Sequence, residues 1–189
     1  MSELDELKAR IDRLESRAEI TELITGYAIA CDEHDIPRLG GLFCTDGTLS
    51  TPNGTMAASG RADIEAMFIE VFKIRGPAFH WTHDVTIRFD DNDPNGATGL
   101  VLGHAETSPN GIASVAALRY HDGYRREGGV WRISAREIHF LYYSPMSEIP
   151  QVLNEADRVT VGGERLAADY PESLPAWQSF NAQYMGIKT

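Results

Sequence analysis

Apolar residues recur every three or four positions at the start of the chain, which is the spacing of an amphipathic helix. They form two successive stripes: Leu4, Leu7, Ile11 and Leu14, followed by Ile20, Leu23, Ile24 and Tyr27. The stripes change phase near Arg17-Ala18. We therefore expect one helix from Ser2 to about Asp32, whose first half faces solvent or a partner and whose second half packs in the core.

Shorter elements follow this helix. Residues 35–43 predict a short helix with a proline in its first turn, where proline is tolerated. Asp46-Gly47 turns into a short strand, and Pro52-Asn53-Gly54 indicates a hairpin. Ser59 is the expected N-cap of a helix over residues 61–72. The apolar residues of that helix recur at helical spacing: Ile64, Met67, Phe68 and Val71.

After Pro77 the hydrophobic period becomes that of strands. Four strands are expected, separated by turns rich in Asn, Asp and Gly: residues 80–90, 98–107, 112–125 and 130–142. Because helices come first and strands afterwards, the fold class is α+β, with the helices laid into the concave side of a strongly twisted antiparallel sheet. Such a cone leaves a pocket at its wide end, where small molecules bind.

The same pattern divides the chain into two parts. Residues 1–144 are expected to form one domain. Residues 145–189 are rich in Pro, Glu and Ala and contain one weak helical stretch over residues 149–158. We expect this extension to cover the domain or a neighbouring subunit, with partial disorder near its end.

Composition narrows the classes of function. The 189-residue chain has a formal net charge of −11 and no basic stripe, which argues against nucleic acid and anionic membranes as partners. It has neither an apolar run long enough to span a membrane nor a signal-peptide pattern, so the cytoplasm is expected. Cys31 and Cys44 lack the spacing of zinc ligands and no other ligand cluster is visible, so we expect no metal. We expect no cofactor either. A half-buried thiol that packs as a small hydrophobic residue is also a commoner role for Cys31 than that of a nucleophile.

Candidate chemistry lies in two short segments. Asp32 closes the first helix and His80 opens the first long strand. A carboxylate that orients an imidazole makes a base that removes a proton without metal or cofactor. His83 is an alternative base, because strand alternation puts it on the same face as Ile87 and puts His80 on the opposite face unless a bulge intervenes.

Three segments carry a resemblance to a known family: residues 17–32, the strand that begins at His80, and residues 124–133. They resemble the SnoaL-like branch of the nuclear-transport-factor-2 superfamily, whose fold is a cone-shaped α+β barrel. The resemblance spans roughly residues 4–145. It is closest to the dehydratase-like members: scytalone dehydratase, bile-acid 7α-dehydratase and hexachlorocyclohexane dehydrochlorinase.

The resemblance assigns roles to three residues. In those enzymes an aspartate on the first long helix orients a histidine on the first strand of the sheet, and the histidine is the base in an elimination. These positions fall on Asp32 and His80, so we favour His80 over His83 as the base. A tyrosine of the bile-acid enzyme falls on Tyr27, whose hydroxyl would stabilise an enolate or protonate a departing hydroxyl.

A second group of residues is expected to bind substrate. It comprises His83, His104, Arg136, Phe68, Trp81 and Phe140. The alternative for the polar members is a place on the sheet surface, and for the aromatic members a place in the ordinary core.

Together these observations predict a cofactor-independent lyase, a dehydratase-like enzyme acting on a hydrophobic polycyclic or aromatic molecule. The alternatives are an isomerase or cyclase of the ketosteroid-isomerase or polyketide-cyclase type with the same base, a non-catalytic small subunit of a ring-hydroxylating oxygenase, and a ligand-binding domain. The exposed first stripe and the long extension favour a homo-oligomer, a trimer or a dimer.

Overall fold

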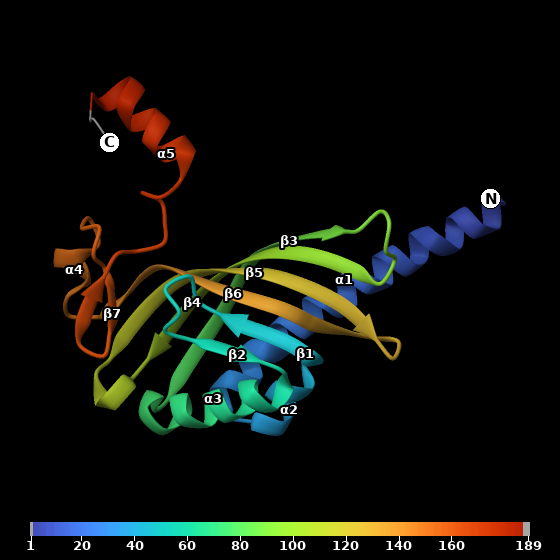
Figure 1. Ribbon diagram of the computed structural model, residues 1–189, viewed down its shortest axis with the longest axis horizontal. Coiled ribbons are helices and arrows are strands. Elements are labelled where there is room, and N and C mark those ends of the chain that lie inside the picture. Colours follow the sequence, from blue (N-terminus) through green and yellow to red (C-terminus); the bar gives the residue numbers. More distant parts are fainter. Residues whose placement is uncertain (1, 187–189) are drawn as a thin grey trace.

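The computed structural model describes residues 2–186. The main helices are α1 (Glu3–Asp32), α2 (Ile36–Gly41), α3 (Arg61–Arg75), α4 (Ile149–Val152) and α5 (Pro175–Phe180), with short turns of helix at Pro109–Gly111 and Asn181–Met185. The strands are β1 (Phe43–Ser50), β2 (Ala57–Ser59), β3 (Ala78–Phe89), β4 (Gly96–Thr107), β5 (Ser114–Glu127), β6 (Val130–Pro145), β7 (Val159–Val161) and β8 (Glu164–Leu166). Helices precede a long curved sheet, so the predicted α+β class is confirmed (Figure 1).

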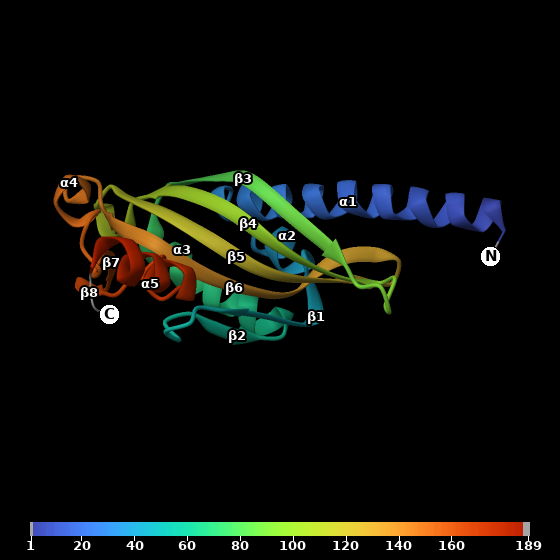
Figure 2. The same ribbon diagram turned by 90° about the horizontal axis from the view of Figure 1, so that it is seen from above.

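Helix α1 begins where its sequence predicts. The Ser2 side chain accepts a hydrogen bond from the backbone N–H of Asp5, and the Asp5 carboxylate accepts one from the backbone of Ser2, which is a capping box. The N-terminal half extends beyond the sheet (Figures 1 and 2), and its apolar stripe is exposed, with Leu14 at 69%. The C-terminal half is buried, with Ile20 and Ile24 almost inaccessible. The helix therefore changes from a free arm to a core element along its length.

The sheet has the strand order β2-β1-β6-β5-β4-β3. Neighbours from β3 to β6 pair antiparallel as predicted, whereas β1 pairs parallel with β6, a long-range pairing that the sequence pattern did not indicate. The core lies between the concave face of this sheet and helices α1 to α3, where Phe43, Phe68 and Val101 are fully buried. Side chains that line an internal cavity therefore come both from the concave face of the sheet and from the helices that cover it.

The start of α3 differs from the prediction. Ser59 does not cap the helix, because its backbone pairs with Thr48 as the last residue of β2. Gly60 is the N-cap instead, with a φ of 90° that glycine adopts without a steric penalty. The helix also continues past the predicted end to Arg75. This extra turn carries Arg75 to the edge of the cavity described below.

The C-terminal extension adds small elements to the sheet. Strand β7 pairs with β6 and β8 pairs with β7, and helix is present only over Ile149–Val152 of the predicted stretch. Arg158 anchors the segment, since its buried guanidinium donates to the Leu141 carbonyl and to both carboxylate oxygens of Glu172. Helix α5 projects away from the sheet (Figure 1). The predicted disorder near the chain end falls partly on residues 187–189, outside the described residues.

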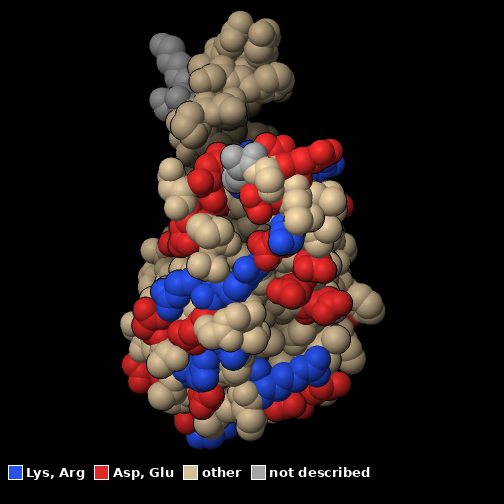
Figure 3. Space-filling view, turned by 90° about the vertical axis from the view of Figure 1, so that its right-hand side faces the viewer, with Lys and Arg blue, Asp and Glu red and all other residues tan. Residues whose placement is uncertain are grey.

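Charge on the surface is mixed. On the face in Figure 3, basic and acidic residues are interspersed, and α5 (Pro175–Phe180), at the top, contains neither. Within residues 2–186, no helix is long and apolar enough to cross a membrane.

Candidate active site

Asp32 and His80 meet on the concave side of the fold, one from the end of α1 and the other from the start of β3. The Asp32 Oδ1 atom lies 2.6 Å from His80 Nδ1. Both carboxylate oxygens also accept from the backbone N–H of His80, at 3.1 and 2.9 Å. The carboxylate thus fixes the backbone and the ring of His80 together, with side-chain exposures of 27% for Asp32 and 10% for His80.

A bulge in β3 explains why His80 and not His83 faces inward. The register with β4 shifts between Thr82 and Val85. Beyond the shift Ile87 is buried, and before it Ala78 is buried, so Ala78, His80 and Ile87 share the inner face. The extra residue leaves His83 exposed on the outer face. Counting by twos along the strand fails here because the bulge changes the parity.

The protonation state of His80 suits a base. Burial lowers the pKa of His80 below its ordinary value, the hydrogen bond with Asp32 opposes this shift, and the charge of Arg75 adds to the lowering. The ring is therefore mainly neutral near pH 7. Because the carboxylate only accepts, Nδ1 carries the ring proton, and Nε2 keeps a lone pair that can take a proton from a ligand.

An inner cavity of about 40 Å³ adjoins His80. It is lined by Tyr27, Met56, Arg75, His80, Ala105, Thr107, Ala116, Leu118, Tyr120, Ile138, Phe140 and Tyr143. Burial raises the pKa of Tyr27 well above its ordinary value, so its hydroxyl stays protonated and can donate. The cavity therefore places a neutral base and a phenol donor in largely apolar surroundings.

A larger outer cavity of about 430 Å³ adjoins the inner one. The two share four lining residues: Met56, Arg75, Phe140 and Tyr143. The rest of the outer wall includes Ile74 of α3, Ile112 before β5, and the β7–β8 turn of the C-terminal extension at Gly162 and Gly163. The inner space admits only a small group, whereas the outer space is large enough for the body of a small molecule.

Arg136 was expected to bind substrate and instead lies behind the cavity wall. Its guanidinium and the carboxylate of Asp122 form a fully buried pair, with Nε–Oδ1 at 2.9 Å and Nη2–Oδ2 at 2.6 Å. The guanidinium lies 4.1 Å from the ring centroid of Tyr27 and 4.2 Å from that of Tyr120. Tyr124 completes the group by donating to Asp122 at 2.7 Å. This arrangement fixes the two tyrosines that line the inner cavity.

The remaining expected residues are divided between the two faces of the sheet. Phe140 lines both cavities. Phe68 is fully buried against Tyr27, with ring centroids 6.2 Å apart, and is a core residue. Three residues lie on the outer face, away from Asp32 and His80: the exposed Trp81 and His83, and His104, which is stacked with His83 at 6.3 Å.

Sequence reasoning missed Arg75 and Asp122. An arginine before Gly76 at a helix end is typical of a cation that complements the helix dipole, so nothing local indicated that Arg75 lines a cavity. Asp122 shares a strand parity with buried Leu118 and Tyr120, and this burial of an acidic residue was a usable signal for a charged partner.

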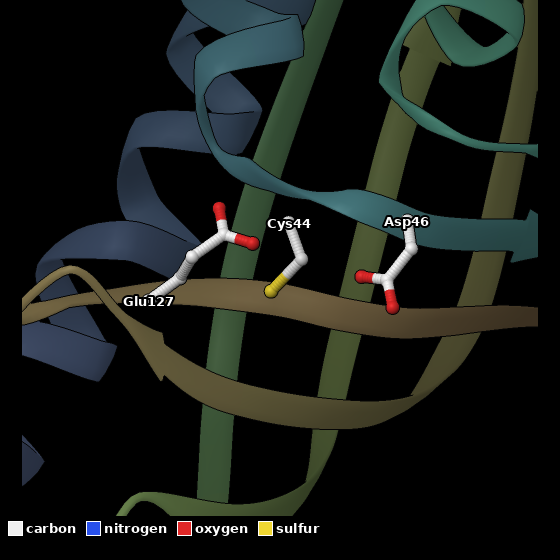
Figure 4. A group of neighbouring side chains, drawn as sticks. All are labelled: Cys44, Asp46 and Glu127. Atoms are coloured by element: carbon white, nitrogen blue, oxygen red, sulfur yellow. The ribbon is translucent and has the colours of Figure 1, made fainter.

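Cys44, Asp46 and Glu127 lie close enough together to suggest a metal site (Figure 4). Their surroundings explain them otherwise. Arg125 hydrogen-bonds to Asp46, and Arg61, Arg125 and Arg132 each lie within ion-pair distance of Glu127. Burial raises the pKa of the Cys44 thiol, which disfavours the thiolate that a metal requires. The group is therefore an ion-pair network beside a packed thiol.

The fold and site together define a cone-shaped α+β domain with an internal cavity and a carboxylate–imidazole pair on its wall. The chain matches the model of the SnoaL-like domain over residues 12–137. It belongs to this family, so the resemblance seen in the sequence is confirmed.

The chain is also similar to individual proteins, with which it shares less than a third of its residues. The chain is 28% identical over 147 residues to the gamma-hexachlorocyclohexane dehydrochlorinase of Sphingobium indicum, covering 74% of this chain and 89% of the relative. A solved hexachlorocyclohexane dehydrochlorinase of type 2 has a TM-score of 0.68 at 21% identity, covering 72% of this chain and 93% of that one. A candidate scytalone dehydratase from Novosphingobium aromaticivorans has a TM-score of 0.66 at 17% identity, covering 72% and 91%. These two structures support the fold.

Proposed function

We propose that this protein is a cofactor-independent lyase that catalyses a dehydratase-like elimination on a hydrophobic polycyclic or aromatic small molecule. The observation that carries the proposal is the Asp32–His80 pair, a neutral imidazole held by a carboxylate on the wall of a cavity. The lyase relative at 28% identity supports the reaction class.

In the proposed reaction, His80 Nε2 removes a proton from a carbon next to a carbonyl group. The electrons of the broken C–H bond pass to the carbonyl oxygen and form an enolate. When the carbonyl reforms, a hydroxyl group leaves from the neighbouring carbon and takes the proton from the His80 imidazolium, so the products are an unsaturated ketone and water.

Asp32 and Tyr27 assist without exchanging atoms with the substrate in this scheme. Asp32 holds the ring and stabilises its protonated form, and the Tyr27 hydroxyl donates a hydrogen bond to the departing hydroxyl. A positioned base contributes about 10²–10⁴-fold, and the remaining rate acceleration comes from orientation and from stabilising the oxyanion.

The experiment is turnover of a panel of polycyclic β-hydroxy ketones and steroid-like alcohols, followed by the absorbance of the conjugated product. The wild type is compared with His80→Ala and with His83→Ala, a matched histidine on the outer face of the same strand. We expect product from the wild type and from His83→Ala, and a loss of about 10²–10⁴-fold in His80→Ala.

Other outcomes favour other functions. A shifted double bond without loss of water would indicate an isomerase with the same base. Compounds that stabilise the wild type and His80→Ala equally, and that neither protein converts, would indicate a ligand-binding domain. Loss of turnover in His83→Ala alone would contradict the assignment of His80.

A further inference from the structure

Arg75 is a positively charged residue at the junction of the two cavities. It is the last residue of α3 and lines both the inner cavity beside His80 and the outer one. Its guanidinium lies over the ring of Phe72, 5.7 Å from the centroid. Stacking on one face leaves the N–H groups at the edge of the guanidinium available to a ligand.

The pairing of Arg75 differs from that of the buried arginines nearby. Arg136 is paired with Asp122, and Arg158 with Glu172. Within residues 2–186, no carboxylate forms an ion pair with Arg75, and its side chain donates no hydrogen bond to these residues. A half-buried guanidinium without an anionic partner beside an apolar cavity has unused hydrogen-bonding capacity.

Stabilisation of the C-terminal end of α3 does not account for the position of Arg75. A cation in the last turn of a helix is stabilised by the helix dipole. Lys73 satisfies that role from the same turn, and it does so in solvent, 61% exposed and 2.6 Å from Glu70. Arg75, by contrast, is directed to the cavities.

The charge of Arg75 also acts on the groups around the inner cavity. It lowers the pKa of His80, where Asp32 acts in the opposite direction and Arg136 in the same one. It also favours the ionised forms of Tyr27, Tyr120 and Cys31, although burial dominates at each of them. The potential in the inner cavity is therefore shifted towards binding negative charge.

We infer that Arg75 binds a substrate oxygen on which negative charge develops, and that substrates of this site are apolar molecules with such an oxygen on the carbon next to the one that loses its proton. The inference rests on the proposed function, which identifies this oxygen as the carbonyl oxygen of the substrate. That oxygen becomes the enolate oxygen when His80 takes the proton. The apolar body then occupies the outer cavity, where Phe140 and Tyr143 stack at 5.7 Å.

Binding of two matched probes tests this assignment without turnover. 2-Naphthoate carries an oxyanion on an apolar body, and 2-naphthamide has the same shape without the charge. We expect the wild type to bind naphthoate at least about tenfold more tightly, since a hydrogen bond to a charged group is stronger than one to a neutral group. Arg75→Gln should lose this preference and still bind naphthamide as the wild type does, whereas the control Lys73→Gln should keep it.

A second readout needs no ligand. Arg75→Gln removes a positive charge and should raise the pKa of His80, which is measured by NMR. The control Lys73→Gln should leave this pKa unchanged. The inference is overturned if the wild type fails to distinguish the two probes, whether it binds both or neither, or if Arg75→Gln keeps the preference. If the naphthoate preference depends on Arg75 but no compound is eliminated, the anion site stands and the lyase proposal fails.

Discussion

Two carboxylates on the concave side of the fold each hold a basic side chain, and the two pairs differ in what surrounds them. The Asp32–His80 pair lies on the wall of a cavity and is partly exposed. The Asp122–Arg136 pair is completely buried, enclosed by Tyr27, Tyr120 and Tyr124. One basic group exchanges protons in the physiological range, and the other remains charged.

The difference shows what each contact can do. Asp32 leaves the Nε2 atom of a neutral ring available at the cavity, so the pair can take up and return a proton. Burial and Asp122 act in opposite directions on Arg136, and the carboxylate prevails, so the pKa of the guanidinium stays above its ordinary value. A sealed pair of this kind keeps neighbouring side chains in place, and its loss leaves an uncompensated charge in the core.

Breaking the sealed pair should have the largest effect. Asp122→Ala leaves the Arg136 guanidinium buried without a counter-ion, and we expect the free energy of unfolding to fall by about 3–5 kcal/mol. The measurement is urea unfolding, with Asp91→Ala as a control, because Asp91 is 89% exposed and its pair with Arg13 is in solvent. The double variant Asp122→Leu/Arg136→Met should recover much of the loss. Equal losses for Asp122→Ala and the control would contradict the distinction between the pairs.

Changing the cavity pair should reduce activity more than stability. Asp32→Asn keeps the shape of the side chain but removes the charge that orients His80 and stabilises its protonated form. We expect turnover to fall on the order of 10²-fold, within the contribution of a positioned base, while the urea midpoint changes less than in Asp122→Ala. Glu33→Gln is the matched control, since Glu33 is the exposed neighbour of Asp32. A variant that kept full turnover would remove Asp32 from the mechanism.

These contrasts also separate what the sequence could predict from what it could not. The start of α1 and the long strands followed from local signals, the Ser2 cap and the period of two, which act within a few residues. The parallel pairing of β1 with β6 joins segments that are far apart, and no local pattern indicates such a partner. The order of the elements up to β6 was therefore predictable, whereas part of the pairing and the strands and helix after residue 158 were not.

The same limit applies to the site. Asp32 and His80 were found because their residue types suit a base and its orienting carboxylate, and because a family resemblance brought the two segments together. The face of His83 could not be predicted, since a bulge between Thr82 and Val85 changes the parity of the strand. The role of Arg75 was hidden because its position depends on where α3 ends relative to the cavity.

The pH dependence of stability and activity should show the smallest effect. It should also give the sharpest contrast between the Asp32–His80 and Asp122–Arg136 pairs. His80 has a folded-state pKa below its unfolded value, so the unfolded chain binds the proton first as the pH falls. Stability should therefore decrease as the pH falls below about 6.5, the unfolded value, and this decrease ends below the folded pKa. Burial also lowers the pKa of His121, so this residue contributes in the same direction. The pH dependence of stability is therefore measured in a His121→Asn background.

Activity requires the neutral form of His80. It should therefore decrease as the pH falls through the folded pKa of His80. Asp32 raises that pKa through its hydrogen bond, so in Asp32→Asn the acid limb of the remaining activity should move to lower pH. Asp122→Asn, assayed where it is folded, should leave the limb in place, because Arg136 does not titrate in this range. The measurement is kcat/KM against pH for the three proteins. If the acid limb moved in Asp122→Asn and not in Asp32→Asn, the assignment of proton transfer to the Asp32–His80 pair would be contradicted.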